Sequence, residues 1–403
     1  MLAAVALHAA AVAQSAFKGN YYGCLDAASK AEKYCDKTLS DEQRVDDILS
    51  RLNLTEKIAF GSPTKAPFCA CHTAPTAGLP DYKWLTEANS CIDSPCHPGA
   101  KGKCATIFVG PNNMAASFNR SSWTAKGDVV STDLRAFNNI GDAMLGARKN
   151  LRTGLGEATD EYGLLGLTGY GPNINVVKDP RYGRNSELPG EDPVLTGEYA
   201  VNYVKGMQQT KTGKGGKPVL KMLSSLKHYT AYSVETSRFT FSASVTNFTL
   251  HDSNLPQYEA AFVEGGASGA MCCKIVLAML FSVCCAARLD NPNGIAIAYA
   301  AYFAPNGVSS CGNEYLLNDR IRTAWKRPDA VVMSDCSAVG NMMKNVMKLN
   351  QSQASAQATN AGLDIYGGWG DNLWGQGYLA EAVGEGLTTE DKITESVRRT
   401  FMQ

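Results

Sequence analysis

Asp335 directly follows a short apolar segment, Ala330–Ser334, and this position is typical of a catalytic carboxylate. The segment is rich in valine and is preceded by a polar turn at 327–329, which predicts a buried parallel strand. Burying an ionisable group at the end of a strand is costly unless the group has a use, and barrel enzymes keep their chemistry at that edge. The alternative is an N-cap of a helix predicted over Val339–Met347, because Asp is a favoured capping residue.

A second predicted strand, Asn173–Val177, is followed by a loop that carries Arg184. Arginine can clamp neighbouring hydroxyl groups of a ligand through paired, charge-assisted hydrogen bonds. The loop also carries several carboxylates, and for three of them the alternative is a structural ion-pair network: Asp179, Glu191 and Asp192.

A third segment, Lys227-His228-Tyr229, follows another predicted strand, and Arg238 lies a little further along the chain. A cation, an imidazole and an aromatic ring together suit a sugar, although a solvent-facing lysine and a packed histidine are the alternative. Segment 82–89 is a weaker candidate, in which Glu87 follows an aromatic pair.

The elements that must position these residues alternate between strands and helices. This order predicts an α/β fold with a parallel sheet, a (β/α)8 TIM-like barrel. The expected strands are Asn173–Val177, Val219–Ser225, Ala267–Met271, Ala330–Ser334 and Leu363–Ile365, and the expected helices are Ser40–Leu52, Asp133–Asn150, Thr196–Gln209, Leu255–Glu264, Ser352–Ala361 and one that begins at Thr389.

Composition excludes several classes of function. The 403 residues include 38 Lys and Arg and 38 Asp and Glu, so no basic surface is predicted to attract nucleic acid. No apolar run reaches the roughly 18 residues that a membrane span needs. The histidines and cysteines lack the paired spacing of a metal site, so neither a metal nor a cofactor is predicted.

The N-terminus predicts secretion. Leu2–Ala13 is apolar and leads to small residues suited to cleavage, which predicts a signal peptide over 1–16 followed by an extension over 17–34; an exposed helical tail is the alternative. Thirteen cysteines favour an oxidising compartment. Four sequons, at Asn53, Asn119, Asn247 and Asn350, are compatible with a secreted glycoprotein.

Five segments, taken together and in order, resemble the N-terminal barrel of glycoside hydrolase family 3, the β-glucosidase and β-xylosidase family. The resemblance runs from about Cys35 to the last residue, which predicts one barrel domain over 35–403. The segments are AASFNRSSW around Asn119, PNINVVKDPRYGR, KHYTAYSVETSR, VVMSDC and AGLDI.

The resemblance implies an exo-acting, retaining double displacement on a β-linked sugar, with an oligosaccharide or glycoside as the partner and no cofactor. By position, Asp335 matches the nucleophile that forms a covalent glycosyl-enzyme. The positions that hold the hydroxyls of the non-reducing sugar are matched by Arg184, Lys227, His228 and Arg238, and Tyr302 matches a tyrosine near the nucleophile.

Two further positions indicate the branch of the family. Glu87 falls where the β-glucosidases usually carry Asp, and Asp335-Cys336 replaces Asp-Trp, as in the β-xylosidase/α-arabinofuranosidase branch. The longer carboxylate narrows the space for a hexose hydroxymethyl group, which favours a pentose and xylan catabolism. Glucose remains the alternative.

Residues 273–300 interrupt a family motif, Met-Cys-Ser-Tyr-Asn, and have no family counterpart. Our hypothesis is a retained intron, because Cys273-Lys274 can be encoded with a donor-like GTAAG and Ala300-Ala301 with a CAG acceptor. Removal would restore Ser-Tyr; a genuine loop insertion is the alternative. The resemblance also implies a disulfide between Cys272 and Cys311, which would enclose the insertion.

The resemblance also implies a missing proton donor. In multidomain relatives the acid/base carboxylate comes from a C-terminal α/β sandwich domain, which we expect to be absent from a truncated chain. Single-domain β-N-acetylglucosaminidases instead carry a second histidine after Lys-His, and Lys227–Tyr232 has none. Two functions therefore remain: a β-glycosidase acting on terminal xylose or glucose, and a catalytically silent sugar-binding barrel.

Overall fold

The computed structural model describes residues 24, 29–62, 82, 84–92, 104–147, 166–212, 218–240, 242–280, 307–343, 347–367 and 372–403. Three sequence predictions fall outside these ranges. They concern the signal peptide over 1–16, most of the predicted insertion, and Tyr302.

Four parallel strands form the central sheet, in the spatial order β1-β4-β6-β9. Nearly all of their residues are buried, as expected for parallel strands that are covered on both faces. A helix separates each strand from the next along the chain, so each βαβ unit adds one neighbour to the sheet. The strands are β1 Thr168–Asn173, β4 Leu223–Tyr229, β6 Gly269–Cys272 and β9 Val331–Ser334.

The sheet is strongly curved. The hydroxyl of Tyr170 in β1 contacts the sulfur of Met333 in β9, although three strand spacings of about 4.8 Å would separate these strands by about 14 Å in a flat sheet. Single bridges extend the sheet at both edges, where Glu87 pairs with Tyr170 and Ile365 pairs with Met333. Trp84, from one edge, lies in the same apolar cluster as Ile365, from the other. The strands therefore curl around an interior filled by side chains.

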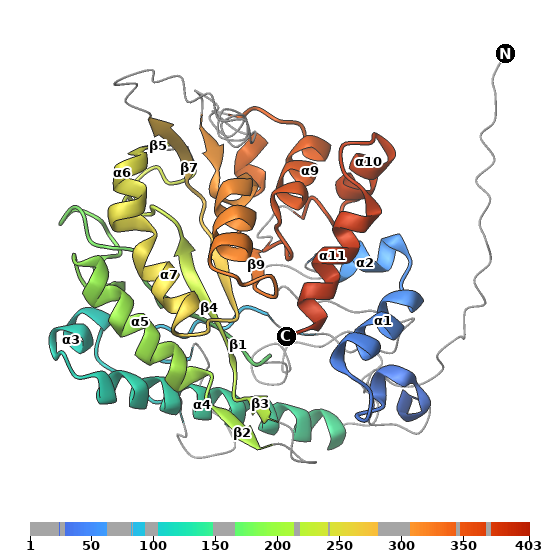
Figure 1. Ribbon diagram of the computed structural model, residues 1–403, viewed down its shortest axis with the longest axis horizontal. Coiled ribbons are helices and arrows are strands. Elements are labelled where there is room, and N and C mark those ends of the chain that lie inside the picture. Colours follow the sequence, from blue (N-terminus) through green and yellow to red (C-terminus); the bar gives the residue numbers. More distant parts are fainter. Residues whose placement is uncertain are drawn as a thin grey trace, which may run out of the picture.

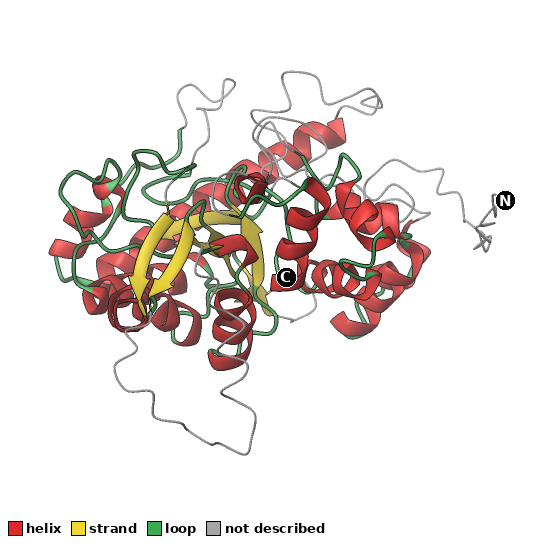
Figure 2. Cartoon of the chain, turned by 90° about the horizontal axis from the view of Figure 1, so that it is seen from above, coloured by secondary structure: helices red, strands yellow, loops and turns green. Residues whose placement is uncertain are grey.

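Helices surround the sheet (Figures 1 and 2). Helix α5 packs between α4 and α7, while α9, α10 and α11 lie beyond β9 together with α1 and α2. None of the described helices is long and apolar enough to cross a membrane. Their bounds are α1 Asp41–Arg51, α2 Leu54–Phe60, α3 Pro111–Ala116, α4 Arg120–Ala147, α5 Pro193–Met207, α6 Asn247–Thr249, α7 Pro256–Val263, α9 Gln351–Ala361, α10 Tyr378–Gly384 and α11 Glu390–Phe401.

Side-chain caps fix where several helices begin. Ser40 and Gln43 form a capping box at α1, and Asn53 and Asn350 begin equivalent boxes at α2 and α9. The carboxylate of Asp192 accepts two backbone N–H groups at the start of α5. Asp192 is therefore a helix cap and forms no ion pair among the described residues, whereas Asp179 does pair with a cation, Arg181. Three of the sequon asparagines accept backbone N–H groups at helix starts: Asn53, Asn119 and Asn350.

Two smaller sheets lie beside the main one. A parallel pair, β5 with β7, is extended by β8, which runs antiparallel to β7. A short antiparallel hairpin precedes β4. The strands are β5 Ser242–Thr246, β7 Val276–Leu280 and β8 Val308–Ser309, and β2 Thr210–Thr212 with β3 Pro218–Leu220.

Strand β1 lies before the predicted position, Asn173–Val177, because two glycines make its sequence unlike that of a typical strand. Glycine is depleted in strands, so the sequence TGYGPN does not favour one. A Cβ on Gly171 would approach the carbonyl oxygen of Ala88 to 2.3 Å. The close passage of segment 84–88 therefore requires glycine at this position in the strand.

The helix predicted over Val339–Met347 is wrong within the described residues. The chain forms turns and a short 3-10 helix, Gly340–Met343. Asp335 therefore does not cap an α-helix, and its Oδ1 accepts a hydrogen bond from the N–H of the next residue, Cys336, at 2.7 Å. Helix α4 begins at Arg120, earlier than predicted, and the strand predicted over Val219–Ser225 is divided between β3 and β4.

Candidate active site

Three of the predicted site residues lie at the carboxyl ends of neighbouring strands. Lys227 and His228 are among the last residues of β4, and Asp335 directly follows β9. Between them, β6 ends at Cys272 and leads to Lys274. Because the strands are parallel, these ends meet at one edge of the sheet. Loops after β1 and β4 bring in the two arginines, Arg184 and Arg238.

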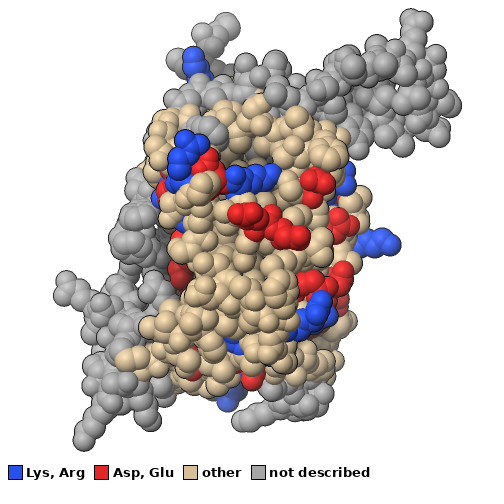
Figure 3. Space-filling model, turned by 90° about the vertical axis from the view of Figure 1, so that its left-hand side faces the viewer, with Lys and Arg blue, Asp and Glu red and all other residues tan. Residues whose placement is uncertain are grey.

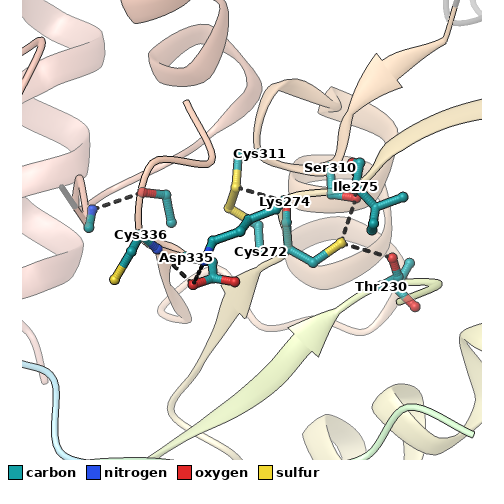
Figure 4. The surroundings of a disulfide bond; sticks show 11 residues. Thr230, Cys272, Lys274, Ile275, Ser310, Cys311, Asp335 and Cys336 are labelled. Carbon is teal, nitrogen blue, oxygen red and sulfur yellow. Dashed lines mark hydrogen bonds and ion pairs between the residues drawn. A yellow bond between two sulfur atoms is a disulfide. The ribbon is translucent and has the colours of Figure 1, made fainter. Parts of the chain in front are cut away.

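Asp335 is buried and paired with a cation. Its Oδ1 lies 3.3 Å from the Nζ of Lys274 and also accepts the N–H of Cys336 (Figure 4). The other carboxylate oxygen, Oδ2, is buried and has no hydrogen-bond partner among the described residues. An unpaired buried oxygen is expensive unless something else binds it, so Oδ2 is the oxygen of Asp335 that keeps hydrogen-bonding capacity for a ligand.

Lys227 forms an ion pair with Glu87 that joins β4 to the segment beside β1. The lysine is buried, whereas the carboxylate of Glu87 is 43% exposed, so the pair presents its acidic side to the surface. Burial of the ammonium group is compensated by the carboxylate. Glu87 keeps acceptor capacity on its open side, where a sugar hydroxyl would donate to it.

Arg184 is held by a carboxylate that the sequence did not single out. Its Nε and Nη2 donate to the two oxygens of Glu187 at 2.8 and 2.7 Å, and Asn173 donates to the same carboxylate at 3.1 Å. Burial tends to raise the pKa of Glu187, but the hydrogen bonds and charge of Arg184 outweigh it and lower that pKa. Glu187 therefore stays ionised and fixes the direction of the arginine fork.

Arg238 is fixed by a second such partner. It donates to Glu235 at 2.8 Å and to the hydroxyl of Tyr232 at 2.9 Å. The centre of the Phe239 ring lies 5.0 Å from the guanidinium of Arg238 and 5.2 Å from the ammonium of Lys274, so one ring contacts both cations.

His228 is buried and neutral. Burial is the main cause of a pKa well below 6.5, and nearby positive charges, Arg184 and Lys227 first, lower it further. Its backbone N–H donates to the side chain of Asn175 at 2.9 Å, and Nδ1 has no partner within the described part of the chain. The neutral ring therefore offers one nitrogen as a donor and one as an acceptor to a polar ligand.

A cavity of about 510 Å³ opens beside these residues. Glu87, Arg184 and Lys227 line it together with Glu187, whereas Asp335 is not part of its wall. The volume suits a small ligand, and acidic and basic groups alternate around it. The remaining wall consists of Asn89, Ser90, Cys91, Ile92, Cys104, Ala105 and Ile107.

The structure thus brings together the predicted residues that it describes. The charges of Arg184, Lys227 and Arg238 all lower the pKa of His228, and the charge of Asp335 contributes to raising the pKa of Arg238. Sequence reasoning missed three residues that hold this set in place: Glu187, Glu235 and Lys274. For the two glutamates, a spacing of three residues from an arginine was a usable signal.

A disulfide joins Cys272 and Cys311, the pair that the resemblance implies, and a second joins Cys24 and Cys35. The neighbouring Cys273 is a buried thiol that donates to the carbonyl of Thr230 at 3.1 Å. Burial raises the pKa of Cys273 to about 11, so it remains a neutral thiol beside the site.

The described residues contain no group suited to hold a metal ion, and one face of the molecule shows no dominant charge. No cluster of three or more His, Cys, Asp or Glu side chains that could hold a metal ion occurs among them. On the face shown in Figure 3, acidic and basic side chains are interspersed across a largely uncharged surface.

Comparison with known proteins establishes the family. Residues 159–402 match the model of the glycosyl hydrolase family 3 N-terminal domain, and the chain belongs to this family. It is 34% identical, over 91% of its length, to β-xylosidase/α-L-arabinofuranosidase 1 of Medicago sativa subsp. varia. It is 32% identical, over 92% of its length, to β-D-xylosidase 3 of Arabidopsis thaliana. The chain spans 40% and 41% of the lengths of these two relatives.

Solved structures show the same fold. A GH3 exo-β-xylosidase in complex with a xylobiose aziridine activity-based probe gives a TM-score of 0.73 at 25% identity, over 94% of this chain and 42% of that chain. β-Glucosidase 3B of Thermotoga neapolitana gives a TM-score of 0.62 at 21% identity, over 88% of this chain and 42% of that chain.

Proposed function

We propose that the chain carries the nucleophile of an exo-acting, retaining β-glycosidase that hydrolyses terminal β-linked xylose or glucose. The observation that carries this proposal is the buried carboxylate of Asp335, which has one oxygen paired and the other without a partner in the described residues. Such a group stands at the carboxyl edge of the sheet in a chain that matches family 3.

In the proposed reaction, Oδ2 of Asp335 attacks the anomeric carbon of the sugar. A bond between Oδ2 and that carbon forms as the bond to the leaving oxygen breaks, and the leaving group departs as an oxyanion that takes its proton from solvent. Water then attacks the same carbon from the opposite side, the bond to Oδ2 breaks to release the carboxylate, and the proton lost by the water passes to solvent. Two inversions give net retention of configuration.

The charged residues at the cavity would hold the sugar hydroxyls. Arg184 and Lys227 are donors whose own partners, Glu187 and Glu87, fix their directions. Glu87 would accept from a hydroxyl at the open side of the pair. Because these contacts are charge-assisted, they orient the ring as well as bind it.

We propose xylose as the preferred sugar. The relatives named as β-xylosidases support it, as does the carboxylate of Glu87 beside the cavity. We also propose that the curved sheet belongs to a (β/α)8 barrel, since its two edges share one apolar cluster. Secretion is supported by disulfides such as Cys24–Cys35 and Cys272–Cys311, because disulfides persist in oxidising compartments.

The described site offers a nucleophile without an evident proton donor. Glu187 is held ionised by Arg184, and Glu87 and Glu235 are each paired with a cation. Loss of general acid catalysis typically costs about 10²–10⁴-fold in rate. We therefore expect this chain to hydrolyse substrates with good leaving groups far better than natural xylosides.

The test is hydrolysis of 4-nitrophenyl β-xyloside and β-glucoside by the purified chain, with Asp335→Ala as the control. We expect turnover of the xyloside to exceed turnover of the glucoside and to fall to the background rate in Asp335→Ala. Xylose binding by calorimetry without any turnover would instead indicate the silent sugar-binding barrel.

A further inference from the structure

We infer that Lys274 is a positioning residue for Asp335: it holds the carboxylate by one oxygen and leaves the other directed at the sugar. This inference rests on the proposed function and adds a residue to it. Lys274 lies at the beginning of the predicted insertion, directly after β6.

The geometry divides the two oxygens of Asp335 between different tasks. Oδ1 receives the ammonium of Lys274 at 3.3 Å and the N–H of Cys336 at 2.7 Å. Oδ2 receives no hydrogen bond from the described residues. Figure 4 shows the lysine reaching the carboxylate from the end of β6, while the N–H of Cys336 comes from the same loop as Asp335.

The other cations of the site are already engaged elsewhere. Lys227 pairs with Glu87, Arg184 with Glu187, and Arg238 with Glu235. Among the described residues, Lys274 is therefore the cation that forms an ion pair with Asp335. Removing it would leave a buried carboxylate without a compensating charge, which favours protonation.

The backbone around Lys274 is rigidly held, so the side chain is preorganised. The N–H of Cys273 donates to the carbonyl of Tyr229 in β4 at 2.8 Å, and the N–H of Ser310 donates to the carbonyl of Ile275 at 3.0 Å. Residues 273–275 are completely or almost completely buried. Burial of the Lys274 side chain already restricts its rotamers, so pairing with the carboxylate costs little additional side-chain entropy.

The other titratable groups near this pair do not replace Lys274. Cys336, beside Asp335, is a neutral thiol because burial, followed by the charge of Asp335, raises its pKa to about 11. Cys273 is a neutral thiol for the same main reason, and His228 from β4 is neutral. Arg238 is charged but bound to Glu235.

The test compares the wild type with Lys274→Met and Lys274→Arg on 2,4-dinitrophenyl β-xyloside, whose leaving group needs no acid. For Lys274→Met we expect kcat to fall about 10²-fold with little change in KM, because the hydroxyl-binding residues are untouched. The acidic limb of its pH–rate profile should move to higher pH. Lys274→Arg should recover most of the rate and the original profile.

Two outcomes separate the inference from the proposed function. If Lys274→Met keeps both the kcat and the pH profile of the wild type, while Asp335→Ala is inactive, the inference is wrong and the proposed function stands. If the wild type shows no turnover that depends on Asp335, the proposed function fails, and the inference fails with it.

Thermal unfolding supplies a readout that does not need activity. We expect Lys274→Met to lower the Tm and the added Asp335→Asn substitution to restore much of the loss, since the two side chains share one ion pair. Losses in Tm that simply add in the double variant would overturn the pairing, even if the single variant folds poorly.

Discussion

Asp335 and Asp364 are buried aspartates on neighbouring segments of one sheet, and their surroundings differ in kind. Asp364 is fully buried, and both oxygens are occupied: Oδ1 by Arg399 at 2.8 Å, and Oδ2 by Arg322 and the N–H of Val332, each at 2.8 Å. The side chain of Asp335 is 9% exposed, pairs with one lysine and keeps one oxygen without a partner in the described residues.

The difference separates a carboxylate that holds the fold together from one that is available for chemistry. Two guanidinium groups and a backbone amide satisfy Asp364 completely, so nothing remains for a ligand. At Asp335, one lysine and one backbone N–H stabilise the buried charge, and one oxygen has no partner among the described residues. Burial alone does not distinguish the two; the occupancy of the second oxygen does.

The largest expected effect is on stability. We expect Asp364→Asn to lower the free energy of unfolding by about 3–5 kcal/mol, because two buried arginines lose their partner. The matched substitution Asp335→Asn should cost less, since one buried cation, Lys274, loses its partner there, whereas two arginines lose theirs at Asp364. Denaturant unfolding of both variants measures the difference, and equal losses would remove the distinction between the two aspartates.

A buried lysine outside the predicted site residues provides a second comparison, because it is a charge with no described carboxylate partner. Lys126 in α4 donates to the hydroxyl of Tyr199 at 3.0 Å, and burial lowers its pKa from 10.5 to about 8. The unfolded chain therefore binds the extra proton between these values, and stability rises with pH across that window. Below pH 8 the charge costs about 3 kcal/mol.

We expect Lys126→Met to be more stable than the wild type at pH 7 and to lose the rise in stability between pH 8 and 10.5. Unfolding curves recorded at several pH values measure both effects. A variant that is less stable at pH 7 would show that the hydrogen bond to Tyr199 outweighs the cost of burial.

His228 provides a smaller, pH-dependent contrast within the site. Its folded pKa lies well below 6.5, so the unfolded chain binds a proton first as the pH falls. The contribution of His228 to stability should fall by up to about 1.4 kcal/mol for each pH unit below 6.5. His228→Asn should show a weaker decline in Tm between pH 6.5 and 5 than the wild type, and parallel declines would contradict a neutral histidine.

The sequence predicts the residues of this site better than the bonds that hold them. The apolar pattern of the strands predicts that three residues lie at the carboxyl edge of the sheet: Asp335, Lys227 and His228. The predicted strand Asn173–Val177 begins about five residues after the observed start of β1. The glycines of β1 allow a close contact with Ala88, and no local sequence signal indicates this contact. The curvature of the sheet that brings Tyr170 and Met333 into contact also depends on tertiary packing, which the sequence pattern does not reveal.

Contacts between residues that are far apart along the chain are also not predictable from the sequence pattern. Glu187 and Glu235 lie three residues from their arginines, so their pairing has a local pattern. Lys274 and Asp335 are far apart along the chain and meet only because β6 and β9 are neighbours in the sheet. Periodicity and motifs carry no information about such a contact.

The two interpretations of residues 273–300 place different residues beside Asp335. In the chain as printed, the residue two positions after Cys272 is Lys274, whereas removal of 273–300 would put Tyr302 at that position. Sequencing the transcript distinguishes them. A message that always retains the 28 codons would contradict the retained-intron hypothesis, and a spliced message would confine the role of Lys274 to the unspliced form.

Trapping the glycosyl-enzyme tests the central claim most directly. The chain would be incubated with 2,4-dinitrophenyl 2-deoxy-2-fluoro-β-xyloside, and the labelled peptide would be identified by mass spectrometry. We predict one fluoroxylosyl group per chain, on the peptide that contains Asp335, and none in Asp335→Asn. Label on another carboxylate, or labelling that persists in Asp335→Asn, would contradict the assignment of Asp335 as the nucleophile.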